Sequence, residues 1–417
     1  MKKYFLLFLL LLPFLTVFSQ TLVPGKPNEN GMSPERLIRI DDLINDQISK
    51  KLIPGAVVLI ARNGKIVFHK AYGYSDAEKQ TPMKSDDIFR IASQTKAITS
   101  LALMMLFEEG KFLLDDQISS FIPEFKNPKV LVNLNWADTT YTTIPAKSGI
   151  TIRQLLTHTS GIDYAGIGSQ EMKAIYSKAG VPAGLGVGNV LLADKMKILG
   201  SLPLKHQPGE AFTYGLNTDV LGYLVEVLSG VSLDEFLKTR IFKPLNMKDT
   251  YFYLPKDKYT RLVPLYQVKK AALERITSSG GVDPNYPVLP GTYYSGGGGL
   301  SSNIEDYAKF LQLFLNKGEY NGARLLSRKT IELMLTNHVQ PPITTQFGLG
   351  FALETDKNDY QSIVTIGSFS WGGAFATSYW ADPKEKLVGI IYTNMFNAPS
   401  QGRSDKFKVL TYQAIVD

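Results

Sequence analysis

The sequence contains no cysteine among its 417 residues. Disulfide bonds, thiolate metal sites, a catalytic thiol and a lipid-anchor cysteine are therefore excluded. Histidine is also scarce: no two of the four histidines stand at metal-ligand spacing, and the sequence has no HExxH motif and no calcium loop. We expect no metal and no cofactor, so the chemistry must come from serine, lysine, tyrosine, histidine or carboxylates. The histidines are His69, His158, His206 and His338.

The chain also has few charged residues and only a small excess of positive charge. Charged residues make up 20% of the chain, the formal net charge is +7, and the densest basic spot is the pair Lys269-Lys270. Such a thin positive excess is typical of a solvated surface, so we expect no nucleic-acid partner. The hydrophobic fraction of 44% excludes a disordered chain and indicates a protein with a substantial core.

The first twenty residues have the pattern of an export signal. Lys2-Lys3 precede an apolar run over residues 4–15, and Val17-Phe18-Ser19 suits cleavage before Gln20. We expect a signal peptide over residues 1–19 and a periplasmic or secreted protein with a net charge of +5. An uncleaved anchor is the alternative, which is disfavoured because a membrane span needs about 20 apolar residues. No later window resembles a transmembrane helix, so the processed chain is expected to have no membrane span.

Both ends of the remaining chain predict strands. Ser33-Pro34 opens a helix over residues 34–48, and two β-rich runs, 56–62 and 65–69, are joined by the hairpin signal Asn63-Gly64. Near the other end, residues 347–353, 362–367, 374–381 and 387–394 are predicted strands, with a turn at 382–385 before the last. A closing helix is predicted from Ser404.

The middle of the chain predicts helices. Residues 93–109 are so apolar that this helix should be buried, while Thr151, Ser232 and Asn303 precede further helices as capping residues. Another helical pattern covers 217–228, and two irregular stretches, 163–205 and 253–294, are predicted to be long loops or small subdomains. The expected fold is α/β (α+β), with an antiparallel sheet built from both chain ends, flanking helices and an inserted all-helical region.

One serine and one lysine stand out as a nucleophile and its base. Ser93 and Lys96 lie three residues apart at the first turn of the apolar helix, hence on one face. A serine hydroxyl is a weak nucleophile until a base takes its proton, and a partly buried lysine that is neutral can do so. The helix amino terminus adds N–H groups where an oxyanion would form.

The S-x-x-K spacing by itself is weak evidence, because chance predicts about two matches in a chain of this composition and one occurs. Its position at the start of a buried helix is more specific, and the rival motifs are weaker still. No G-x-S-x-G elbow supports a histidine-based triad. The run Gly296–Gly299 lacks the Lys-Ser/Thr ending of a phosphate-binding loop, so we expect a bend where backbones approach closely.

These residues belong to a wider pattern. The chain resembles the serine β-lactamase and penicillin-binding-protein superfamily, in particular the class C β-lactamase-like branch and the family VIII-type carboxylesterases. The resemblance covers nearly all of the processed chain. Its segments are Pro54-Gly55-Ala56, 89–96 (FRIASQTK), 113–116 (LLDD), 152–162 (IRQLLTHTSGI), 208–214 (PGEAFTY), 219–222 (DVLG), 295–302 (SGGGGLSS) and 371–373 (WGG).

The resemblance implies the roles of the site residues. It makes Ser93 the acylated nucleophile, Lys96 its partner and Tyr214 the second-motif tyrosine that shares general-base duty with the lysine. It places the oxyanion hole at the backbone N–H groups of Ser93 and of Ala374, which we expect at the start of a strand. Trp371, Gly372 and Gly373 stand at the third motif, beside the substrate.

Two departures from the β-lactamase pattern bear on the substrate. The second motif, Y-x-N in the family, reads Tyr214-Gly215-Leu216, with Asn217 one place late. On a helix this shift turns the amide by about 100°. Trp371 stands where the β-lactamase K-T-G motif has its lysine, which removes a cation for a substrate carboxylate. Trp371 suits an apolar acyl or alcohol group, although a packed core aromatic is an equal alternative.

We therefore predict an exported serine hydrolase that cleaves, or transfers, the acyl group of small-molecule esters through a Ser93 acyl-enzyme. One alternative is a β-lactamase or D-amino-acid-specific peptidase that takes amides, and another is a non-catalytic binding module. Residues 20–417 are expected to form one catalytic domain. Within it, a sheet subdomain would cover about 33–88 and 295–417, and a helical subdomain about 89–294. The sequence does not fix the oligomeric state.

Overall fold

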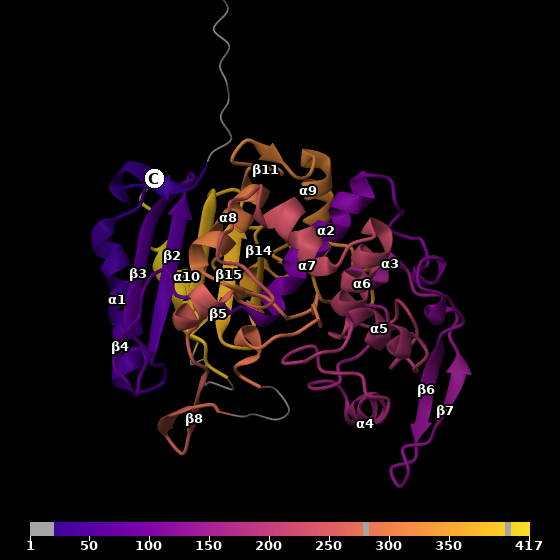
Figure 1. The fold of residues 1–417 in the computed structure, drawn as a ribbon. Helices are drawn as coiled ribbons and strands as arrows, with labels where there is room; N and C mark the ends of the chain where they lie inside the picture. The colour runs from indigo at the N-terminus through magenta and orange to yellow at the C-terminus, as the bar shows by residue number, and fades with distance from the viewer. Residues whose placement is uncertain (1–20, 278–282, 397–401) are drawn as a thin grey trace, which may run out of the picture.

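The N-terminal hairpin forms where Asn63-Gly64 predicts it. Both residues adopt left-handed backbone angles (φ 55° and 73°), which suits the tight turn between β2 (Gly55–Arg62) and β3 (Lys65–Asp76). The computed structural model describes residues 21–277, 283–396 and 402–417, and Figure 1 shows its arrangement. The expected signal peptide and its cleavage site lie outside the described residues. The helix after Ser33 is α1 (Pro34–Ser49), and the Ser33 side chain accepts a hydrogen bond from the Arg36 N–H.

A central sheet joins the two ends of the chain, in the order β1-β3-β2-β16-β15-β14-β13, with β4 beside β3. The sheet is antiparallel except for the short pairing of β1 with β3, and β2 pairs with β16 in its middle. The mixed α/β class and the sheet drawn from both termini are therefore as predicted. The other strands of the sheet are β1 (Val23–Pro24), β4 (Thr81–Pro82), β13 (Ala352–Leu353), β14 (Phe369–Gly373), β15 (Thr377–Asp382) and β16 (Leu387–Tyr392).

Two of the predicted C-terminal strands were wrong. Residues 362–367 are not a strand, because β14, the next-to-last strand of the sheet, begins later, at Phe369. Of residues 347–353, Ala352–Leu353 pair with β14, and Phe347 forms an isolated bridge with Ala352. The strand predicted from Ala374 begins at Thr377, because residues 374–376 form the turn that connects β14 to β15. The predicted turn at 382–385 is present, with the Asp382 carboxylate accepting from the N–H groups of Lys384 and Glu385.

The two faces of the sheet are covered by different helices (Figure 1). On β2, Val57 and Leu59 face the core that contains α2 (Thr95–Glu108) and α8 (Ile304–Leu315), whereas Val58 and Ile60 face the core that contains α1 and α10 (Arg403–Tyr412). This alternation follows from the period of two along a strand. As predicted, helix α2 is buried from Thr95 to Leu106.

Gly389 provides a test of packing on the α10 side. It pairs with Trp380 across β16 and β15, and a Cβ at position 389 would lie 2.2 Å from the Trp380 ring. Trp380 also packs on Phe407 of α10. We expect Gly389→Ala to displace the ring and to lower the free energy of unfolding by about 1–3 kcal/mol, as overpacking does. Urea denaturation measures this, and an unchanged unfolding midpoint would contradict the packing described.

A helical region lies beside the sheet, to the right in Figure 1. The predicted capping box forms at Thr151 and Gln154. The stretch 163–205 was predicted to be irregular, but it contains two helices, α4 and α5. They were not predicted because the apolar pattern of each is too short to indicate a helix. The helices of this region are α3 (Ile152–Leu156), α4 (Gln170–Lys178), α5 (Leu192–Gly200), α6 (Asn217–Ser229) and α7 (Leu233–Leu237). None of the helices in the described ranges is both long and apolar enough to cross a bilayer.

Shorter elements complete the fold. Two hairpins project from it: β6 (Lys129–Leu134) with β7 (Tyr141–Pro145), and β8 (Tyr266–Lys269) with β9 (Ala272–Arg275). The second hairpin lies in the predicted irregular stretch 253–294. The remaining strand pairs are β5 (Phe89–Arg90) with β10 (Ser301–Ser302), and β11 (Glu319–Tyr320) with β12 (Ala323–Arg324). Helix α9 covers Arg328–Met334.

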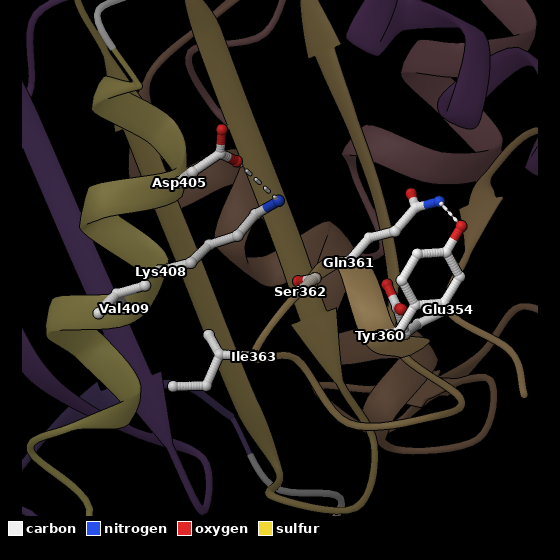
Figure 2. A pocket seen from close by; sticks show the side chains of 8 residues that line it. All are labelled: Glu354, Tyr360, Gln361, Ser362, Ile363, Asp405, Lys408 and Val409. Carbon is white, nitrogen blue, oxygen red and sulfur yellow. Dashed lines mark hydrogen bonds and ion pairs between the residues drawn. The ribbon is translucent and has the colours of Figure 1, made fainter. Parts of the chain in front are cut away.

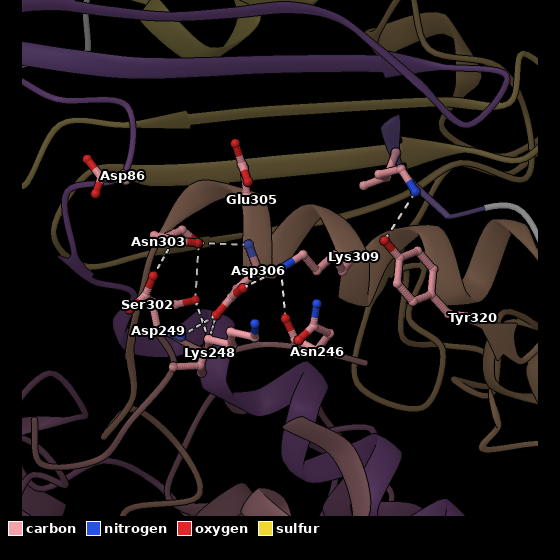
Figure 3. A network of polar contacts seen from close by, with 12 residues as sticks. Asp86, Asn246, Lys248, Asp249, Ser302, Asn303, Glu305, Asp306, Lys309 and Tyr320 are labelled. Atoms are coloured by element: carbon pink, nitrogen blue, oxygen red, sulfur yellow. Dashed lines mark hydrogen bonds and ion pairs between the residues drawn. The ribbon is translucent and has the colours of Figure 1, made fainter. Parts of the chain in front are cut away.

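A polar network fixes the start of α8 to the chain before it (Figure 3). Asn303 caps the helix by accepting from the Asp306 N–H. The Asp306 carboxylate accepts from the Asp249 N–H and from Lys309, and Asp249 in turn accepts from Asn303 and pairs with Arg261. These contacts give α8 a fixed position, which matters because α8 also contacts the turn that carries Ser93.

Candidate active site

Ser93 lies in a strained turn between β5 and α2. Residues Ala92–Gln94 form one 3-10 turn, and α2 begins directly after it. Ala92 is buried and has a φ of 44°, a left-handed angle that is uncommon for a residue other than glycine. In a 3-10 turn side chains three apart eclipse each other, so Lys96 lies beside Ser93. The sequence predicted this pairing, although it placed Ser93 inside the helix.

Neighbouring elements hold this turn from several sides. Gln94 is fully buried: its carbonyl accepts from the Tyr307 hydroxyl of α8, and its side-chain oxygen accepts from the Tyr392 hydroxyl of β16. Before the turn, the buried guanidinium of Arg90 donates to the carbonyls of Val263 and Pro284. The turn is therefore fixed to the sheet, to α8 and to the loops beyond, which limits the movement of Ser93.

Lys96 is the polar centre of the site. Its Nζ lies 3.4 Å from the Ser93 Oγ, donates to the Tyr164 hydroxyl at 2.8 Å and donates to the Gly297 carbonyl at 2.6 Å. It also lies 4.6 Å from the centre of the Tyr214 ring. The side chain is only 3% exposed, so these contacts replace its hydration. The structure thus brings Ser93, Lys96 and Tyr214 together.

The charge of Lys96 differs from the sequence expectation of a neutral amine. Burial by itself disfavours the ammonium, but the phenol oxygens of Tyr164 and Tyr214 outweigh it and raise the pKa of Lys96 above its ordinary value. None of its hydrogen-bond partners is cationic. Lys96 is therefore an ammonium group at neutral pH in the resting protein.

Tyr214 and Trp371 meet on the other side of Lys96. The Trp371 Nε1 donates to the Tyr214 hydroxyl at 3.4 Å, and the two ring centres are 5.5 Å apart. Trp371 lies on β14 and also packs edge-on against Phe347. Its ring thus packs against core aromatics, one of the two roles that the sequence left open, and its N–H points at Tyr214. Its role toward an acyl or alcohol group stays a prediction.

Tyr164 was missed by the sequence analysis. It follows the segment 152–162 by two residues, and its hydroxyl is the nearest side-chain partner of Lys96. Asp163 accepts from the Tyr164 N–H and fixes the backbone there. Burial raises the pKa of Tyr164, so it remains a phenol. A tyrosine inside an irregular stretch gives no periodic signal, and only the neighbouring motif could have pointed to it.

The end of β14 lies against the residue that precedes the nucleophile turn. A Cβ on Gly373 would lie 2.3 Å from the Ile91 carbonyl oxygen, so only glycine allows this approach. Gly372 lies beside it on the strand, and the exposed residue Ala374 follows in the turn of residues 374–376, not at the start of a strand. Within the described chain the Ala374 N–H donates to no other backbone group. This approach brings the end of β14, at Gly373, to the turn that carries Ser93.

Asn217 does not reach Lys96. Its side-chain amide is buried and contacts His158 Nδ1 at 3.0 Å and the Ser160 hydroxyl. Burial also lowers the pKa of His158 well below its usual value, so this histidine is neutral. The displacement of the asparagine by one position thus has the consequence that the sequence predicted, since the amide binds the core and not the site.

A separate cavity of about 490 Å³ opens on the opposite side of the sheet. It lies between α10 and the segment 354–363, with Glu354, Tyr360, Lys408 and Val409 in its walls (Figure 2). None of the predicted site residues lines it. In the described ranges no cluster of three or more His, Asp or Glu side chains is arranged to hold a metal ion.

Comparison with known proteins agrees with this geometry. The sequence profile of the beta-lactamase family matches residues 40–413. The chain belongs to the beta-lactamase family. This family consists of serine hydrolases, so the protein is an enzyme of the serine hydrolase superfamily.

Several known proteins align along most of the chain. Protein Rv1367c of Mycobacterium tuberculosis is 33% identical over 82% of this chain and 85% of its own length. Esterase EstB of Burkholderia gladioli is 26% identical over 90% of this chain and 94% of its own. The solved structure of EstCE1, a hydrolase with promiscuous acyltransferase activity, superposes with a TM-score of 0.78 at 27% identity, covering 91% of this chain and 99% of that one.

Proposed function

We propose that this protein hydrolyses carboxylic esters of small molecules through a covalent acyl-enzyme on Ser93. The observation that carries the proposal is that Ser93 and Tyr214 both lie beside the buried ammonium group of Lys96. A hydroxyl beside a proton-accepting group can become a nucleophile, and a covalent intermediate divides hydrolysis into two easier steps. A binding module would have no use for this arrangement.

In the proposed mechanism Lys96 and Tyr214 act as one proton-transfer unit. The active form of the pair lacks one proton: Lys96 remains an ammonium group and the Tyr214 oxygen carries the negative charge. That oxygen accepts the Ser93 proton as Oγ attacks the ester carbonyl carbon. The N–H groups of Ser93 and Ala374 receive the oxyanion.

The second half of the reaction repeats these transfers. Tyr214 returns the proton to the departing alcohol as the carbon–oxygen bond breaks, which leaves the acyl group on Ser93. Water then attacks the acyl-enzyme, with Tyr214 accepting its proton, and the carboxylic acid leaves as the Ser93 hydroxyl is restored. An alcohol in place of this water would give acyl transfer, the side activity named for EstCE1.

Esters are preferred over β-lactams and D-amino peptides because of Trp371. An indole at this position offers no cation for a substrate carboxylate, whereas its apolar face suits an acyl or alcohol group. Asn217, bound to His158, adds no amide to the site. The relationship to EstB supports the same choice. Export by a signal peptide over residues 1–19 belongs to the proposal and places the substrate outside the cytoplasm.

A substrate screen tests the proposal. The wild-type protein and Ser93→Ala are assayed with p-nitrophenyl esters of several chain lengths, a chromogenic cephalosporin and a D-alanyl muropeptide. We expect Ser93-dependent hydrolysis of the esters, with kcat/KM at least about a hundredfold above that for the other two classes. Faster turnover of the cephalosporin, or release of D-alanine, would instead identify a β-lactamase or peptidase.

Tyr164 supplies a second prediction within the site. Tyr164→Phe removes the oxygen that accepts from Lys96 and leaves the ring in place. We expect kcat to fall by about ten- to a hundredfold, because Lys96 loses a hydrogen bond that fixes it, while KM changes little. Tyr223→Phe on α6 is the control, expected to retain wild-type kinetics. Equal activity of the two variants would remove Tyr164 from the catalytic arrangement.

A further inference from the structure

Asp219 is a buried carboxylate that the proposed mechanism does not yet use. It lies in the first turn of α6, five residues after Tyr214, and is fully buried. Its Oδ1 accepts from the Ser295 hydroxyl at 2.6 Å. Its Oδ2 faces the backbone of Gly297, where a Cβ would lie 2.3 Å away. Within the described chain no lysine or arginine forms an ion pair with Asp219, although a charge without compensation is costly in such a place.

The positive charge that can compensate Asp219 is the Lys96 ammonium, which lies on the opposite side of Gly297. Gly297 faces Asp219 with its Cα and accepts from the Lys96 ammonium with its carbonyl at 2.6 Å. The preceding carbonyl, that of Gly296, accepts from Thr99 of α2 at 2.8 Å. The glycine segment is therefore clamped between α2 and α6, with the carboxylate behind it and the ammonium in front. No bulkier residue would leave room for this separation.

We propose that Asp219 is a positioning residue that acts through Gly297 and Ser295 to hold Lys96 in place and in its charged form. The proposal rests on the proposed function, because it assigns the counter-charge of the Lys96–Tyr214 pair. Asp219 does not touch the substrate. Its carboxylate stabilises the ammonium across Gly297, and the segment it anchors presents the carbonyl that Lys96 binds.

The other groups that face this pair do not supply a negative charge in the resting protein. Tyr164 remains a phenol, His158 is neutral, and burial raises the pKa of Tyr293 next to Asp219. Tyr214 is the remaining neighbour of Lys96, and it is the group whose proton the mechanism moves. Burial raises the pKa of the Asp219 carboxyl, whereas the Ser295 hydroxyl and the Lys96 ammonium act in the opposite direction, so the negative charge that the proposal assigns to Asp219 depends on these two groups.

The effect of removing this charge has a definite sign. Without the carboxylate the ammonium is less favoured, so Lys96 gives up its proton at lower pH than in the wild type. The pH–rate profile reports the proton held by the Lys96–Tyr214 pair. Its limbs should therefore move toward lower pH. A residue that only filled space would lower activity or stability without moving the profile.

Asp219→Asn tests the proposal on the full-length processed protein. With a p-nitrophenyl ester we expect kcat to fall at least about tenfold, KM to stay within about twofold, and the profile to move about one pH unit or more toward acid. Asp219→Glu keeps the charge and should keep the profile in place, even where kcat falls. Thermal unfolding of each variant confirms that it is folded. A folded Asp219→Asn with the wild-type profile would overturn the proposal.

Two further measurements keep the test decisive. If Asp219→Asn does not fold, Ser295→Ala replaces it: this variant removes the donor to Oδ1, weakens the ionised carboxylate and should shift the profile in the same direction by a smaller amount. An unmoved profile would then overturn the proposal. The labelling rate of Ser93 by a fluorophosphonate is followed in parallel, because it reports the same shift if esters are not the substrate. If wild-type Ser93 is not labelled at all, both proposals fail.

Discussion

Replacement of Ser93 by alanine is expected to lower ester hydrolysis by at least about 10³-fold, to the background of the assay. The reason is chemical: the proposed covalent step needs the Oγ atom, and no other hydroxyl that hydrogen-bonds to Lys96 is an aliphatic nucleophile. Initial rates with a p-nitrophenyl ester, measured on wild-type and variant protein at equal concentration, check this. Because Ser93 is not part of the packed core, the variant should unfold at the wild-type temperature.

The matched control for this variant is Ser100→Ala. Ser100 lies on α2, seven residues after Ser93, and is buried, and among the described residues its hydroxyl is not a hydrogen-bond partner of Lys96. We expect it to retain activity within about twofold. If Ser93→Ala keeps substantial activity while Ser100→Ala behaves as the wild type, the hydrolysis proceeds without an acyl-enzyme on Ser93.

Lys96→Met is expected to cause the second large effect, on both catalysis and stability. The methionine approximates the length of lysine but has no charge and no donors, so the Tyr164 hydroxyl, the Gly297 carbonyl and Asp219 lose their cation. We expect kcat to fall by about 10³-fold or more. We also expect a loss of about 1–3 kcal/mol in the free energy of unfolding, as when buried acceptors lose a charged donor. Enzyme kinetics and urea denaturation measure the two effects.

The pH dependence of this stability has a predictable direction. Because folding raises the pKa of Lys96, the ammonium contributes its full stabilisation below the ordinary lysine pKa and loses it only as the pH rises through the higher value of the folded state. The stability gap between wild type and Lys96→Met should thus persist at neutral and acidic pH and narrow at strongly alkaline pH. Lys96→Arg keeps the charge and should retain more stability than Lys96→Met. If Lys96 were neutral in the folded protein, the stability gap would not narrow at alkaline pH.

Local signals in the sequence predicted the fold well wherever one short segment decides the structure. Asn63-Gly64 specifies a turn, Ser33-Pro34 a helix start, and Thr151 with Gln154 a capping box, and all three are present. The edge of the sheet was harder to predict. Residues 362–367 and Phe369–Gly373 are similarly apolar, and only pairing with β15 selects the second run. This choice depends on contacts between strands and not on propensity.

In the candidate site, too, the contacts within one short segment were predictable and those between distant segments were not. Ser93 and Lys96 lie within one turn, so their spacing predicts their contact. Tyr164, Asp219 and Gly297 come from three distant parts of the chain and converge on Lys96 only after folding. The charge of Lys96 could not be predicted either, because it depends on which groups surround the amine. Burial alone favours the neutral form, and the contacts with oxygen atoms reverse that preference.

The central claim is that Ser93 is the activated nucleophile of this protein. The most direct test is intact-protein mass spectrometry after treatment with a fluorophosphonate, followed by peptide mapping. We predict one adduct per chain, located on Ser93, formed at a rate that follows the pH dependence of ester hydrolysis, and absent from Ser93→Ala. A wild-type protein that hydrolyses esters but carries no adduct, or carries it on another serine, would contradict the account.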